Sequence, residues 1–121
     1  MEVQFELDGH NFRVLDGPCV EDNTATNAAN DFGKQLISAL PEMREFASNK
    51  LLSTYNDSWT DDAHHELTAK QFEAKLVNPQ IVIYDELGAA TIYFADSDMF
   101  GGHSVEVIVY NGEINHTSIV G

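Results

Sequence analysis

The fold class is decided by residues 105–119, VEVIVYNGEINHTSI. Two runs of β-branched and aromatic residues, 105–110 and 114–119, flank the dipeptide Asn111-Gly112, and such runs are typical of strands. Both central residues of a type I′ turn need a positive φ, which Asn and Gly adopt readily. The stretch therefore predicts two antiparallel strands joined by a two-residue turn.

Further strands are predicted on both sides of the middle of the chain. Residues 81–84 and 91–94 are also β-branched and aromatic, and they come shortly before the hairpin of residues 105–119. At the N-terminus, apolar and acidic or amide residues alternate over residues 3–7, and a second run covers 12–15 after the turn Asp8-Gly9. The short links predict antiparallel neighbours.

The middle of the chain changes to a helical period. Apolar residues recur every three or four positions from about residue 26 to 40, which predicts a helix. Pro41 is expected to begin a second helix, and a single kinked helix is the alternative. Thr68 and Gln71 have the spacing of a capping box for a third helix, which ends before Asn78-Pro79.

This order, β-β-α-α-α-β-β-β-β, predicts one α+β domain over residues 1–121. We expect an antiparallel sheet of about six strands with the helices packed on one face.

The composition is strongly acidic. The 121 residues include 20 Asp or Glu and only 6 Lys or Arg, so the net charge is −14. This charge disfavours binding to nucleic acid or to anionic membranes, both of which attract Lys and Arg. The N-terminus lacks the pattern of a secretory signal, and the single Cys19 excludes an internal disulfide. We therefore expect a cytoplasmic protein with a basic protein partner.

Acidic and aromatic residues gather after the predicted second helix. The residues that we expect to contact the partner are Tyr55, Asp57, Trp59, Asp61, Asp62 and Glu66. Aromatic anchors carry much of the energy of protein interfaces, and a negative field speeds association with a basic partner. The acids could equally serve solubility, and the two aromatic residues could equally cover the core.

A second unusual segment lies between two predicted strands. Asp96, Asp98 and His103 could supply oxygen and nitrogen ligands to a metal ion, although the spacing differs from that of a calcium loop. Alternatively, Gly101 and Gly102 adopt positive φ while a neighbouring phenylalanine fills the core. The loop could also contact a partner. The sequence contains no nucleophile elbow or phosphate-binding loop, so we expect a protein that is not an enzyme.

The C-terminal segment 92–121 resembles small uncharacterised bacterial domains. The resemblance depends on an aromatic-Gly-His-Ser element, here Phe100-Gly101-Gly102-His103-Ser104, and on the ending Ile119-Val120-Gly121. Some such domains are immunity proteins of bacterial toxin systems, so the resemblance implies that the protein neutralises a toxin.

Two hypotheses follow. In the first, the chain is an immunity protein that binds a basic, nuclease-type toxin domain without any cofactor. In the second, it is a metal-binding enzyme or sensor that uses Asp96, Asp98 and His103. Added metal would raise the thermal stability of dialysed protein only under the second hypothesis.

Overall fold

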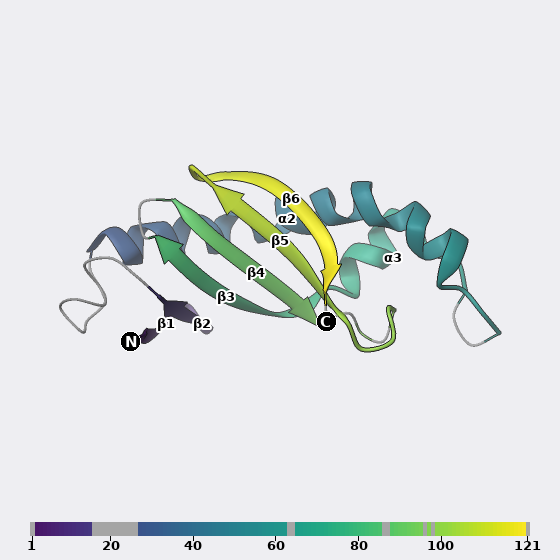
Figure 1. Ribbon diagram of the computed structural model, residues 1–121, viewed down its shortest axis with the longest axis horizontal. Coiled ribbons are helices and arrows are strands. Elements are labelled where there is room, and N and C mark those ends of the chain that lie inside the picture. The colour runs from purple at the N-terminus through teal and green to yellow at the C-terminus, as the bar shows by residue number, and fades with distance from the viewer. Residues whose placement is uncertain are drawn as a thin grey trace.

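The computed structural model describes residues 2–15, 27–62, 65–85, 88–95, 97 and 99–120. Within these ranges the chain forms six strands and two helices (Figure 1). In chain order they are β1 (Val3–Leu7), β2 (His10–Val14), α2 (Asn27–Ser58), α3 (Ala69–Ala74), β3 (Val77–Asp85), β4 (Ala89–Ala95), β5 (Ser104–Tyr110) and β6 (Glu113–Val120). The α+β class is confirmed. Cys19 lies outside the described residues.

All six strands belong to one sheet, in the order β1-β2-β3-β4-β5-β6. Four of the neighbouring pairs are antiparallel, but β2 pairs with β3 in parallel through residues 12–14 and 81–83. The expectation of a fully antiparallel sheet was wrong at this one pair. The connection from β2 to β3 passes through the helices rather than a tight turn, and such a crossover allows the chain to return in the same direction.

The tight turns follow the sequence predictions. Tyr110 pairs with Glu113 across the turn, and the intervening Asn111 and Gly112 have φ of 53° and 74°. Asp8 and Gly9 likewise have φ of 51° and 80° between β1 and β2. Both predicted hairpins are confirmed. They form because a two-residue turn with positive φ matches the twist of the flanking strands.

One helix of 32 residues, α2, runs through Pro41, so the alternative of a single helix holds and the preferred prediction of two helices was wrong. A proline inside a helix costs about 3 kcal/mol, but Pro41 is exposed and the buried stripe continues across it, from Leu36 and Leu40 to Met43 and Ala47. Burying each large apolar side chain contributes roughly 1.5–3 kcal/mol. The continuous packing therefore outweighs the proline.

The short helix α3 begins as predicted. The Thr68 hydroxyl accepts a hydrogen bond from the backbone N–H of Gln71 at 3.2 Å, and the Gln71 side chain accepts one from the Thr68 N–H at 2.9 Å. These two bonds satisfy donors that the first turn of a helix leaves free. The capping box is confirmed.

The core lies between α2 and one face of the sheet. In Figure 1 the sheet faces the viewer and α2 passes behind it. Side chains of alternate strand residues, among them Phe12, Ile81 and Ile92, are fully buried in this layer. Gly33 lets α2 approach closely, because a Cβ there would lie 3.3 Å from the Phe12 ring. The opposite face of the sheet has no described helix over it, and we call it the open face.

Candidate functional site

The predicted partner-binding residues lie at the C-terminal end of α2 and just after it. Asp57, Asp61, Asp62 and Glu66 are exposed, and Trp59 is half-buried. We call these five residues the acidic end. The helix continues through Ser58, and the Trp59 N–H donates to the Tyr55 carbonyl at 2.9 Å. Trp59 therefore has a defined position.

Tyr55 belongs to the core instead of the surface. Its side chain is 2% exposed, and its hydroxyl donates to the carbonyl of His65 at 3.4 Å. Burial, followed by the charge of Asp61, raises the pKa of Tyr55. Of the two interpretations of this residue, its position favours packing, so contact with a partner at this end falls to Trp59 and the acids.

Asn56 holds the segment that follows α2 against the helix end. Its side-chain amide donates to the Leu67 carbonyl at 3.1 Å and accepts from the Leu67 N–H at 2.9 Å. Thr60 also donates to the Asn56 carbonyl at 3.2 Å. These bonds keep Glu66 near the end of the helix, although Glu66 and Asn56 are ten positions apart in the chain.

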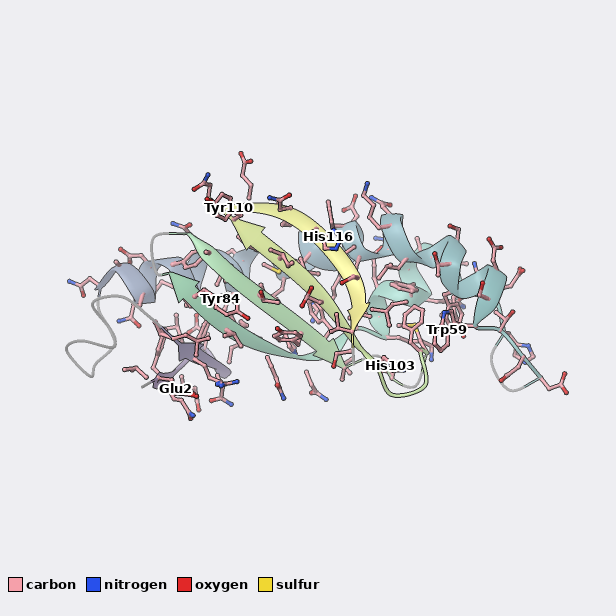
Figure 2. The ribbon with its side chains drawn as sticks, viewed as in Figure 1. Glu2, Trp59, Tyr84, His103, Tyr110 and His116 are labelled. Carbon is pink, nitrogen blue, oxygen red and sulfur yellow. The ribbon has the colours of Figure 1, made fainter. Side chains whose placement is uncertain are left out.

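An aromatic cluster joins the acidic end to the turn between β4 and β5. Phe100 is fully buried, and its ring lies 5.6 Å from that of Tyr55 and 5.3 Å from that of Trp59, both edge to face. The Trp59 ring also lies 6.4 Å from the ring of His103 (Figure 2). The structure thus brings together two segments that the sequence offered as separate sites.

The turn itself follows the structural alternative. Gly101 and Gly102 have φ of 65° and 89°, and Phe100 fills the core as that interpretation predicted. The backbone N–H of His103 donates to the Phe100 carbonyl at 3.3 Å, while its side chain is exposed beside Trp59.

Only one of the three proposed metal ligands is among the described residues. Asp96 and Asp98 lie outside the described residues, whereas His103 is described. Across the described part of the chain, no group of three or more His, Cys, Asp or Glu is placed to hold a metal ion. None of the described helices is long and apolar enough to cross a membrane.

Sequence reasoning missed the tyrosines of the open face. Tyr84 and Tyr110 are 43% and 58% exposed, and Tyr93 lies on the same face, since residues 81, 83, 92, 94, 107 and 109 alternate with them and point into the core. Strand alternation was the signal that could have found them, because it assigns every second residue to one face. The runs 81–84, 91–94 and 105–110 were predicted as β-branched and aromatic strands, without assignment of their residues to faces.

An ion pair marks one side of the open face. The Arg13 guanidinium binds the Glu2 carboxylate through two contacts of 2.8 and 2.9 Å, and the Gln4 amide donates to the same carboxylate at 3.1 Å. The hydrogen bond from Arg13, followed by that from Gln4, lowers the pKa of Glu2 to about 2. Arg13 is therefore occupied by Glu2, and positive charge on this face is largely compensated.

The fold and these surfaces define a small α+β domain with an acidic composition, exposed tyrosines on the open face of its sheet and, among the described residues, no group placed to hold a metal ion. Residues 9–119 match the model of a family described as an uncharacterised protein conserved in bacteria, DUF2262. The chain belongs to this family, which confirms the expectation of a small uncharacterised bacterial domain. No curated protein and no solved structure matches the chain.

Proposed function

We propose that this protein is an immunity protein that neutralises a basic, nuclease-type bacterial toxin by binding it directly. The observation that carries the proposal is the acidic end, where four exposed carboxylates lie within seven positions of a half-buried tryptophan at the end of α2. An aromatic anchor within a field of one sign is a typical arrangement for recognising a partner of opposite charge.

The cations of the protein do little to offset this field. Arg13 is paired with Glu2, while Arg44 donates to the Leu76 carbonyl at 3.0 Å and lies 5.1 Å from the centre of the Phe94 ring. Lys50 lies 5.7 Å from the centre of the Phe46 ring. Three of the 6 Lys and Arg residues thus have structural contacts of their own, in a chain whose net charge is −14.

A strong negative field suits an inhibitor of a nuclease. A nuclease binds phosphates through Lys and Arg, so an acidic protein is attracted to the same cleft and competes for it. Electrostatic steering raises association rates by roughly 10- to 1,000-fold at low salt. Rapid capture is valuable when the toxin acts inside the cell that must be protected.

A survival assay tests the proposal. The C-terminal domain encoded by the open reading frame immediately upstream in the source genome would be expressed in a test host. Surviving colonies would be counted with and without this protein. We expect killing by the neighbour alone and survival when both are present. Killing that this protein does not relieve, or a harmless neighbour, would contradict the proposal.

Charge-matched variants then locate the contact. We expect the triple variant Asp57→Asn, Asp62→Asn, Glu66→Gln to weaken binding to the toxin domain by about tenfold or more, chiefly through the association rate. The control, Asp31→Asn, Glu42→Gln, Glu45→Gln, removes the same charge from exposed positions elsewhere on α2. Equal weakening by both triples would show that net charge alone matters and that the acidic end is not the contact.

Trp59 provides the test of the anchor. We expect Trp59→Ala to weaken binding by roughly 30-fold or more, as hot-spot tryptophans do. Because Trp59 also packs on Phe100, the melting temperature would be measured alongside, and Trp59→Phe would preserve the packing. An affinity unchanged in a folded Trp59→Ala variant would remove Trp59 from the contact.

A further inference from the structure

The aromatic residues of this chain are sorted between the two faces of the sheet. Of its 4 tyrosines, Tyr55 is in the core, whereas Tyr84, Tyr93 and Tyr110 lie on the open face. The phenylalanines of the strands, Phe5, Phe12 and Phe94, lie on the helix-covered face. A phenol carries a large apolar ring and a polar group that stays hydrated, so the open face presents aromatic area without becoming insoluble.

Two side chains are buried on the open face although no described helix covers it. Val82 and Thr91 are 6% and 5% exposed, and they pair directly with each other across β3 and β4. They belong to one row of paired residues that crosses all six strands: Gln4, Arg13, Val82, Thr91, Ile108 and His116. Their burial shows that the side chains around them are closely packed.

Tyr84 and Tyr93 supply part of that packing. Each lies two positions along its strand from the buried pair, on the same face and on opposite sides of it. A hydrogen bond with Tyr84, followed by burial, raises the pKa of Tyr93 to about 12. The hydroxyl groups of these two tyrosines are therefore joined before any partner arrives, which reduces the entropy lost on binding.

The platform still offers surface to a partner. Tyr84 and Tyr110 are the large apolar side chains that are exposed in the described part of the chain, and both can be seen on the sheet in Figure 2. Tyrosine is enriched among the residues that dominate binding energy at protein interfaces. We call Tyr84, Tyr93 and Tyr110 the tyrosine platform.

The charge around the platform selects the partner. Glu106 pairs with Tyr93 in the register of β4 and β5, and Glu113 pairs with Tyr110 across the β5–β6 turn. The cation at its other side, Arg13, is bound to Glu2. Carboxylates beside exposed tyrosine rings suit arginine, which binds carboxylates through its fork of donors and stacks on aromatic rings.

A hollow of about 880 Å³ adjoins the platform at Arg13. It lies between the β1–β2 hairpin and the start of β3, where the parallel pairing of β2 with β3 is limited to three residues. The residues that line it include the acidic Glu6 and the amide residues Gln4, Asn11 and Gln80, together with apolar residues such as Phe5 and Ile81. Carboxylate and amide oxygens accept hydrogen bonds from a guanidinium, so the hollow can receive an arginine side chain.

We propose that the open face, through the tyrosine platform and the adjoining hollow, docks a protein surface that presents arginine side chains. This inference deepens the proposed function, because it assigns the basic partner a second contact surface besides the acidic end. Complementary charge, the ordered rings and the hollow each favour an arginine-bearing protein over a second copy of this acidic chain.

The test uses an arginine octapeptide as the probe and ¹⁵N-labelled full chain. We expect backbone shifts in NMR spectra to concentrate on residues 4–6, 80–84, 91–93 and 106–110, and an octalysine peptide to bind several-fold more weakly. The double variant Tyr84→Ala, Tyr110→Ala should weaken octa-arginine binding about tenfold. Phe46→Ala is the matched control, since Phe46 is a half-buried ring on α2 away from the sheet's open face.

Other outcomes overturn the inference. Shifts centred on the acidic end or spread evenly would show that the field alone attracts the peptide, as would wild-type affinity in the double variant. Without peptide, resonances of the open face could shift as the protein concentration rises, while light scattering detects a dimer. That result would make the open face a self-association surface. Failed colony rescue with the expected shifts would remove the proposed function only, whereas rescue without those shifts would remove this inference only.

Discussion

The two faces of the sheet use the same six strands for different purposes. Adjacent residues such as Val107 and Ile108, or Ile92 and Tyr93, point in opposite directions, so each strand contributes equally to both. The covered face has aliphatic and phenyl side chains packed on α2, whereas the open face has phenols, carboxylates and amides. Strand alternation thus allows core packing and a polar, aromatic surface to be encoded at neighbouring positions without conflict.

The largest expected effect separates the faces by stability. Ile92→Ala removes a fully buried side chain from the covered face, so we expect it to lower the free energy of unfolding by about 2–5 kcal/mol. The control, Ile108→Ala, removes the same atoms from a half-exposed position on the open face and should cost less than about 1 kcal/mol. Urea unfolding measures both free energies, and equal losses would show that the two faces contribute alike to stability.

A second pair compares two arginines. Arg44 donates to the Leu76 carbonyl and lies over Phe94 on the helix side, so Arg44→Ala should cost about 1.5–3 kcal/mol, the range for a hydrogen bond that involves a charged group. Arg13 is exposed and paired with Glu2 on the open face. We expect Arg13→Ala to leave the melting temperature unchanged, since exposed ion pairs contribute little. Destabilisation by Arg13→Ala to the same extent would show that the open face also carries stability.

A third prediction concerns the hydrogen bond between Tyr84 and Tyr93. Tyr84→Phe removes the hydrogen bond that raises the pKa of Tyr93, so we expect that pKa to fall from about 12 toward its ordinary value near 10. Because absorbance reports all 4 tyrosines together, the ring ¹³C shift of Tyr93 in NMR spectra during alkaline titration measures it. Because the raised pKa favours the neutral phenol, this contribution to stability is complete below pH 10 and is lost as the pH rises through 12. An unchanged titration in Tyr84→Phe would show that the two phenols do not interact.

The smallest effect concerns Glu2. Its lowered pKa of about 2 means that its ion pair with Arg13 persists well below the ordinary value of 4.5. The associated stability is present above pH 4.5 and is lost as the pH falls through 2. Carboxyl carbon shifts in NMR spectra would report this titration, and the variant Arg13→Lys, which loses the paired donors of the guanidinium, should move it upward. A Glu2 carboxyl that titrates near 4.5 would contradict the pair.

Much of the local structure was predictable because its causes are local. The turn Asn111-Gly112 and the capping box of Thr68 depend on residues within four positions of each other. The single helix through Pro41 was not predictable in this way, since the cost of the proline is local while the packing that outweighs it comes from the sheet. The same holds for the parallel β2–β3 pair, which depends on a connection of more than sixty positions, from residue 14 to 77.

The site divides in the same manner. The acids of the acidic end could be chosen from the sequence because charge is a property of residue type, and they are exposed as expected. The burial of Tyr55 and the contact of Trp59 with His103 could not, since both depend on Phe100 arriving from the β4–β5 turn.

The sequence by itself determined the strands, the tight turns, the start of α3 and the strong negative charge, all of which follow from residue type and short-range spacing. Only the tertiary structure decided which carboxylate lies beside each tyrosine of the open face, because that depends on the register between strands. It also decided that two distant segments meet at Trp59, because packing joins residues that no local pattern connects.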